Sequence, residues 1–170
     1  MERGYVHIYT GAGKGKTTAA LGLAVRALGA GLTACVVQFV KGVECSEIRT
    51  LRKLEIPVYQ FGHGCFIMGE PSLDDRQIAA QGLAVVREII DRGDVDVLIL
   101  DEVNVALGLR LLDLADVLEL VQSKPAGLEL VLTGRGAPRE LLDAADLVTE
   151  MVKVKHYYDR RVPARDGIEA

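Results

Sequence analysis

The chain alternates between short apolar runs and longer segments whose apolar residues recur every three or four positions. Six runs rich in Val, Ile and Leu predict β-strands, over residues 6–9, 33–39, 57–61, 95–100, 128–133 and 147–152. Between them, the helical spacing predicts helices over residues 16–28, 47–54, 73–91, 112–123 and 139–145. Runs that are apolar throughout indicate strands buried on both faces. This order predicts an α/β fold, a three-layer sandwich with a mostly parallel central sheet.

Length and composition narrow this prediction to one domain over residues 1–170. The chain is 49% hydrophobic and 26% charged, with a formal net charge of −4. No linker or repeat divides it, and 170 residues can enclose one core. A basic stripe with interleaved aromatic residues is missing, so we expect no nucleic-acid partner. Without a leader peptide or a run long enough to span a bilayer, we expect a cytoplasmic protein with no membrane partner.

A glycine-rich motif joins the first predicted strand to the first predicted helix. It consists of Thr10, Gly11, Ala12, Gly13, Lys14, Gly15, Lys16, Thr17 and Thr18. Backbone N–H groups around such glycines, together with the following helix N-terminus and a lysine, bind phosphates. The usual pattern is G-x-x-x-x-G-K-[ST], and here Thr10 replaces its first glycine. The motif therefore predicts a P-loop NTPase-like fold that binds a nucleotide polyphosphate, with a variant loop.

Two carboxylates end the fourth predicted strand, at Asp101 and Glu102. A carboxylate at that place can hold Mg²⁺ opposite the hydroxyl of Thr17. We favour Glu102 as the metal partner, which makes Thr17 and Glu102 the predicted metal ligands and leaves Asp101 a structural role. The alternative is that both acids only cap the next helix.

Other polar residues follow strands, where ligands bind in parallel α/β sheets. Arg135, in the turn Thr133-Gly134-Arg135-Gly136, is a candidate for phosphate contact or an ordinary surface arginine. Gln38 and Lys41 follow the second strand and are candidates to line the cleft. Residues 62–71 form an irregular, glycine-containing loop around an apolar island. The polar segment 153–170 is either a C-terminal tail or a lid.

Five motifs, in order along nearly the whole chain, resemble one known family. They are the loop from Thr10 to Thr18, Val36-Val37-Gln38-Phe39-Val40-Lys41-Gly42, Leu98-Ile99-Leu100-Asp101-Glu102, Thr133-Gly134-Arg135-Gly136, and Val154-Lys155-His156 with Asp159, Ala164-Arg165 and Gly167-Ile168. In these motifs the chain closely resembles the P-loop family of cob(I)yrinic acid a,c-diamide (corrinoid) adenosyltransferases.

The resemblance implies transfer of the 5′-deoxyadenosyl group of ATP to the Co(I) ion of a reduced corrinoid, with release of triphosphate. Lys16, Thr17, Glu102 and Mg²⁺ would then serve the leaving group. The ATP contacts would be residues 10–18, Arg26 and Arg135, although Arg26 could equally be a solvated helix residue. Orientation and electrostatics would carry the catalysis, because Co(I) is itself the nucleophile.

The resemblance also extends to the corrinoid and to partners. Gln38 and Lys41 would line the corrinoid site, and Phe66 with Met68 would cover the lower face of the corrin. The alternative for this apolar island is a loop pinned onto the core. A homodimer and a flavoprotein-type reductant are implied as partners. Two other functions stay open from the residues alone, a P-loop small-molecule kinase and a non-enzymatic ATP-dependent switch.

Overall fold

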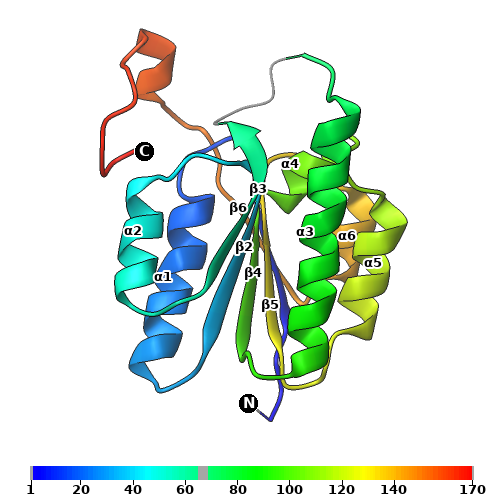
Figure 1. The fold of residues 1–170 in the computed structure, drawn as a ribbon. Coiled ribbons are helices and arrows are strands. Elements are labelled where there is room, and N and C mark those ends of the chain that lie inside the picture. The colour runs from blue at the N-terminus through cyan, green and yellow to red at the C-terminus, as the bar shows by residue number, and fades with distance from the viewer. Residues whose placement is uncertain (1, 65–68, 170) are drawn as a thin grey trace.

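The protein is described by a computed structural model over residues 2–64 and 69–169, which form a central sheet between two layers of helices (Figure 1). The strands are β1 (Val6–Thr10), β2 (Ala34–Lys41), β3 (Val58–Gly64), β4 (Val97–Asp101), β5 (Glu129–Thr133) and β6 (Leu147–Glu150). They lie in the order β3-β2-β4-β5-β1-β6, and each neighbouring pair is parallel. The predicted three-layer α/β fold is confirmed, with a wholly parallel sheet.

The helices follow the strands in alternation. They are α1 (Lys16–Gly29), α2 (Ser46–Lys53), α3 (Leu73–Arg92), α4 (Val103–Gly108), α5 (Leu114–Ser123) and α6 (Arg139–Ala144), with a short 3-10 helix, η1 (Tyr157–Arg160). Figure 1 shows α1 and α2 on one face of the sheet and α3 to α6 on the other. Parallel strands need such crossover connections, so the alternating sequence pattern and the layered fold have one cause.

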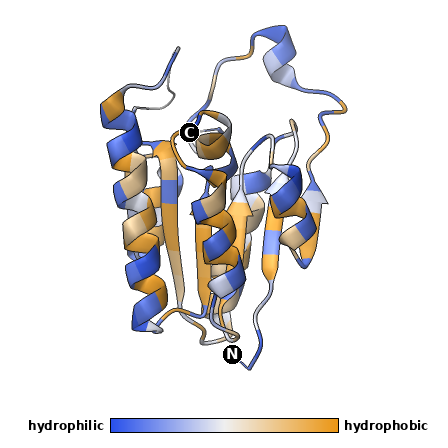
Figure 2. Ribbon diagram, turned by 90° about the vertical axis from the view of Figure 1, so that its right-hand side faces the viewer, coloured by the Kyte–Doolittle hydropathy of each residue, from blue (hydrophilic) through white to orange (hydrophobic). Residues whose placement is uncertain are grey.

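Two apolar clusters fill the spaces between the sheet and its helices. One joins the strands to α3 and the shorter helices and includes Phe39 and Leu100. The other contains Ala20 and Ala24 of α1, whose small side chains pack against Ile99. All five residues of β4 are buried, which explains why this strand is apolar until its last residue. Figure 2 shows the strands as mainly hydrophobic.

The structure differs from the predicted elements at several places. Residues 62–64, which were expected to begin an irregular loop, are the last residues of β3. Helix α4 was not predicted, because six residues that are mostly buried give no helical period to detect. All four residues of β6 are exposed, so the prediction that the apolar runs are buried on both faces is wrong for this strand. The cause is its position at the sheet edge, beside β1.

In the described part of the chain, no helix is long and apolar enough to cross a bilayer.

The parallel arrangement brings the carboxyl ends of all six strands to one edge of the sheet. The segments that leave this edge include the glycine-rich loop after β1, residues 42–45 after β2, Glu102 after β4 and residues 134–138 after β5. The predicted site residues in these segments therefore lie along the same edge of the sheet, where ligands usually bind in such folds.

Candidate nucleotide and metal site

The glycine-rich loop is folded around its own lysine. Lys16 is the first residue of α1 and is only 8% exposed. Its Nζ donates hydrogen bonds of 2.8 Å to the carbonyl oxygens of Gly11 and Gly13. Burial, as the largest cause, lowers the pKa of Lys16. The ammonium is thus held at the centre of the loop, close to where backbone N–H groups would meet phosphate oxygens.

The segment after β6 supports this loop from behind. The N–H of Gly13 donates to the carbonyl of Met151 at 2.6 Å, and Met151 donates in turn to the carbonyl of Thr10 at 2.8 Å. A Cβ atom at Gly13 would lie 2.6 Å from the Met151 oxygen, so this close approach requires glycine. Thr10, which replaces the usual first glycine, is still part of β1, and its hydroxyl accepts a hydrogen bond from the Ala137 N–H at 3.3 Å.

Asp101 is the centre of a buried hydrogen-bond network. Its Oδ1 accepts from the hydroxyls of Thr17 at 2.8 Å and Thr133 at 2.6 Å. Its Oδ2 accepts from Nε2 of Gln38 at 2.8 Å, and its side chain is fully buried. Gln60 of β3 extends the network, because its Nε2 donates to Oε1 of Gln38 at 2.9 Å. One carboxylate therefore ties together α1 and three neighbouring strands, β2, β4 and β5.

Glu102 lies beside this network but faces a more open region. It precedes α4 with a left-handed φ of 60°, and its N–H donates to the Thr133 hydroxyl at 3.0 Å. Its side chain is 21% exposed. Burial, and then the charge of Asp101, raise the pKa of Glu102. Lys41 is close to both acids, with Nζ 3.6 Å from Oδ2 of Asp101 and 3.8 Å from Oε1 of Glu102.

The donor set at this place fits Mg²⁺. Thr17, Asp101 and Glu102 offer oxygen atoms, which are the ligands that Mg²⁺ prefers. The Thr17 hydroxyl donates a hydrogen bond to Asp101, so its oxygen lone pairs stay available. Within residues 2–64 and 69–169, no group of three or more His, Cys, Asp or Glu side chains could hold a metal. The site therefore suits an ion that arrives with phosphate oxygens and water among its ligands.

Arg135 is close enough to act electrostatically on the site. Burial is the main cause of the lowered pKa of Lys16, and the charge of Arg135 adds to it; the same charge offsets a small part of the rise in the pKa of Glu102. The preceding Gly134 is fixed by its N–H, which donates to the carbonyl of Tyr9 at 3.1 Å, and by its carbonyl, which accepts from Nδ2 of Asn104 at 3.4 Å. The turn after β5 thus holds the Arg135 cation on a fixed backbone.

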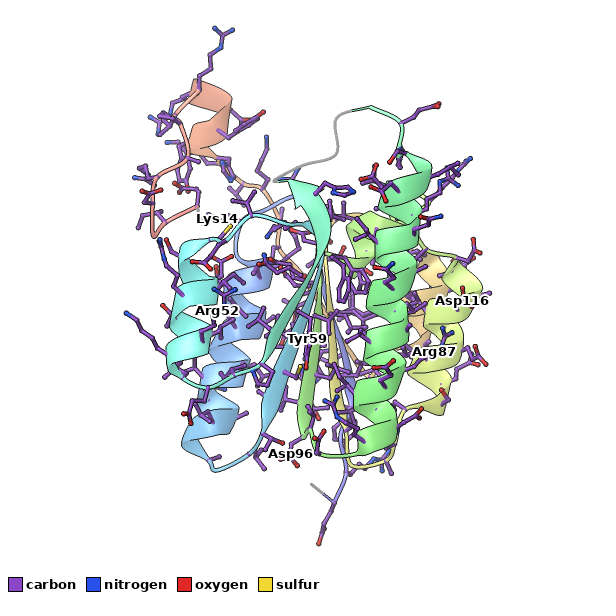
Figure 3. The ribbon with its side chains drawn as sticks, in the orientation of Figure 1. Lys14, Arg52, Tyr59, Arg87, Asp96 and Asp116 are labelled. Atoms are coloured by element: carbon purple, nitrogen blue, oxygen red, sulfur yellow. The ribbon has the colours of Figure 1, made fainter. Side chains whose placement is uncertain are left out.

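The C-terminal segment also meets the glycine-rich loop. The Lys14 ammonium donates to the carbonyl of Ile168. Figure 1 shows this part of the chain beyond the carboxyl edge of the sheet, and Figure 3 labels Lys14 there. An ion pair between Arg165 and Glu169 at 2.9 Å, and a hydrogen bond from Tyr157 to Glu169, fold the segment on itself. Residues 153–169 therefore reach the site without being part of the sheet.

The structure brings together most of the predicted site residues. Lys16, Thr17, Gln38, Lys41 and Glu102 surround or adjoin Asp101.

Arg26 is not brought to this cluster. It lies ten residues after Lys16 on α1, which is about 15 Å along the helix axis. Thr18 and Ala12 are exposed on the loop and the first turn of α1. Phe66 and Met68, the predicted cover of the corrin, lie outside the described residues.

Two contributors to the site, Gln60 and Met151, were not identified from the sequence. Asp101 was expected to have a structural role, and it accepts a hydrogen bond from the Thr17 hydroxyl. Gln60 interrupts an apolar run, but its pairing with Gln38 on the next strand is visible only in the structure. Met151 left no signal in the sequence, because it acts through backbone atoms only.

Comparisons with known proteins identify the family of this chain. The model of the family described as "ATP:corrinoid adenosyltransferase BtuR/CobO/CobP" matches residues 2–170. A corrinoid adenosyltransferase of Pseudomonas aeruginosa is 37% identical over 171 residues, which covers 99% of this chain and 84% of the relative. The corrinoid adenosyltransferase of Escherichia coli K12 is 34% identical over 175 residues, covering 99% of this chain and 86% of the relative. An uncharacterized protein of Nostoc is 37% identical and covers 90% of this chain, but only 45% of that protein is matched. The chain belongs to the ATP:corrinoid adenosyltransferase family and is an enzyme of that family.

Proposed function

We propose that this enzyme transfers the 5′-deoxyadenosyl group of ATP to the Co(I) ion of a reduced corrinoid and releases intact triphosphate. The electron pair of Co(I) forms the bond to C5′, while the bond between C5′ and its oxygen breaks and leaves its electrons on the triphosphate. Cobalt is thereby oxidised to Co(III). The nucleophile needs no deprotonation, so the protein's tasks are orientation of C5′ and stabilisation of the leaving group.

The observation that carries this proposal is the cluster of cations and donors at one edge of the sheet. Lys16 is held between the loop carbonyls, and Arg135 is close enough to influence it. Both can stabilise the charge that develops on the triphosphate. Thr17 and Glu102 would hold Mg²⁺, and Asp101 would keep the Thr17 hydroxyl oriented. When bound, Mg²⁺ neutralises phosphate oxygens and thereby lowers the barrier to departure.

The corrinoid side of the proposal depends on other residues. Lys41 is at the carboxyl end of β2, near the acids, and would face the corrinoid, while the buried Gln38 would support this side of the site from within its hydrogen-bond network. Phe66 and Met68 would cover the lower face of the corrin and keep its lower axial position empty, which makes cobalt easier to reduce. We also propose a homodimer, a flavoprotein-type reductant and a cytoplasmic location, as the family resemblance implies.

One anaerobic reaction tests the proposed function. The protein is mixed with chemically reduced cobalamin and MgATP, and the corrin spectrum is followed for adenosylcobalamin. Phosphorus NMR of the quenched mixture should then show intact triphosphate in equal amount. Stoichiometric ADP would support a kinase instead, and tight nucleotide binding without corrinoid-dependent turnover would support an ATP-dependent switch. A parallel reaction with Lys16→Ala controls for uncatalysed transfer.

A further inference from the structure

We infer that the Lys41 ammonium occupies the place of a divalent cation between Asp101 and Glu102, and that it moves onto the phosphate chain when the metal binds. This makes Lys41 a residue of the metal and phosphate site, in addition to the cleft-lining role proposed above. The inference rests on the proposed function only for the identity of the phosphate chain. The exchange of cations is a property of the site itself.

The position of Lys41 is the first support. Its Nζ is 3.6 Å from one carboxylate and 3.8 Å from the other, and its side chain is 21% exposed. Both distances exceed those of a normal hydrogen bond, so the ammonium neutralises the two acids without being bonded tightly to either. The Lys41 ammonium is therefore a displaceable cation.

An irregularity in β2 is the second support, because it directs Lys41 toward the acids. Side chains alternate along a regular strand, yet Phe39 and Val40 both belong to the same apolar cluster. Val40 has a left-handed φ of 68°, and the pairing with β3 shifts register between Phe39 and Lys41. A β-branched residue rarely adopts this backbone conformation. In a regular strand Lys41 would instead follow Phe39 onto the apolar face.

The neighbouring backbone holds this irregularity in place. A Cβ atom at Gly42 would lie 1.9 Å from the carbonyl oxygen of Gly62, so the end of β2 can approach β3 only with glycine at this position. The Gly42 N–H also donates to the carbonyl of Gly64 at 2.8 Å. Bulges of this kind often re-aim a side chain next to an active site. Here the re-aimed group is the cation that faces both acids.

The charges predict opposite effects on two ligands. A divalent cation alone must displace the Lys41 ammonium from between the carboxylates, so removal of that positive charge should strengthen its binding. When a polyphosphate binds together with its metal, the displaced Lys41 ammonium can contact the phosphate oxygens. Removal of the same charge should therefore weaken the binding of the polyphosphate. A purely structural residue would change both affinities in the same direction or leave both unchanged.

The experiment compares Lys41→Met with the parent and with Lys53→Met, which removes the same charge from the exposed last residue of α2. Free Mn²⁺ in an EPR titration without nucleotide is the probe for the metal place. Isothermal titration with inorganic tripolyphosphate and Mg²⁺ is the probe for the phosphate place. Lys41→Met should bind Mn²⁺ about fivefold more tightly and Mg-tripolyphosphate about tenfold more weakly, as expected for loss of one nearby partly buried charge. Lys53→Met should change neither by more than about twofold, because its charge is exposed and screened.

Circular dichroism checks the fold of each variant, and Lys41→Ala replaces Lys41→Met if the latter does not fold. The inference is overturned if the folded variant binds Mn²⁺ no more tightly than the parent, or if it binds Mg-tripolyphosphate equally well. Neither measurement needs a corrinoid or enzymatic turnover. A protein that failed to make adenosylcobalamin could therefore still show the cation exchange, and a protein that made adenosylcobalamin could still fail to show it.

Discussion

Replacement of Asp101 by asparagine should destabilise the fold, because every neighbour of this buried carboxylate is a donor. Thr17, Thr133 and Gln38 donate to it, and the Lys41 ammonium lies 3.6 Å away. An amide accepts at one end only, so its NH₂ group must face either the two hydroxyls or the NH₂ group of Gln38. The hydroxyls can rotate to accept, but all three hydrogen bonds lose their charge assistance.

The expected magnitude follows from this count. A hydrogen bond to a charged group contributes about 1 kcal/mol more than a neutral one, so three such bonds correspond to a loss of about 3 kcal/mol in the free energy of unfolding. For a domain of this size, that loss lowers the melting temperature by about 6–12 °C.

Glu102→Gln should have the opposite effect, and the sign follows from the direction of the pKa shift. Burial and the charge of Asp101 raise the pKa of Glu102 above its ordinary value of 4.5, so the folded protein binds this proton more readily than the unfolded chain does. The stability contributed by Glu102 therefore falls as pH rises from about 4.5 through the raised pKa. Above that pKa the ionised side chain costs stability, and glutamine removes the cost.

Thermal unfolding between pH 5 and 8, without nucleotide or metal, measures both effects. Asp101→Asn should melt well below the parent throughout, and Glu102→Gln should melt at the parent temperature or above it at pH 7. The parent's decline with rising pH should also be smaller in Glu102→Gln. The proposed division between a buried organising acid and a more open metal-facing acid is refuted if Asp101→Asn melts like the parent, or if Glu102→Gln is the less stable variant.

Three further variants test the catalytic assignments. Lys16→Ala should slow adenosyl transfer from preformed cob(I)alamin about a hundredfold or more at saturating ATP, and near-parental turnover would contradict the loop assignment. Gln60→Glu should turn the Gln38 amide around and raise the Mg²⁺ concentration for half-maximal nucleotide binding about tenfold, equivalent to roughly one hydrogen bond. An unchanged Mg²⁺ titration would show that the hydrogen-bond chain from Gln60 through Gln38 to Asp101 does not affect the metal. Phe66→Ala should impair the reaction from cob(II)alamin with a mild reductant more than the reaction from cob(I)alamin, and equal losses would indicate core packing instead.

The sequence predicted the parallel α/β architecture because strands covered on both faces, such as β4, are apolar without interruption. It could not predict α4, whose six residues are too few for a helical period. The exposure of β6 depends on the spatial order of strands, and an apolar run looks the same at an edge or in the centre.

Local motifs identified the glycine-rich loop and the paired acids, because these groups are contiguous in the chain. They favoured Glu102 for the metal and Asp101 for a structural role, but they could not show the left-handed backbone at Glu102 that separates the two side chains. That conformation directs the two adjacent carboxylates into different environments, one buried and one more open. Gln60 is equally inaccessible to motif analysis, since its partner Gln38 is 22 residues away in the chain and meets it only across β2 and β3.

The Asp101 network also connects ligand binding to the stability of the sheet. Its donors come from α1, β2 and β5, while the acid itself ends β4, so the network is complete only when the central strands are in register. The segment after β6 adds the support for the loop through Met151. A nucleotide that binds here selects the folded arrangement of all these elements, because a ligand stabilises the state that contains its site. Nucleotide with Mg²⁺ should therefore protect the amides of β2, β4 and β5 from hydrogen exchange together, rather than only those of the loop that it contacts.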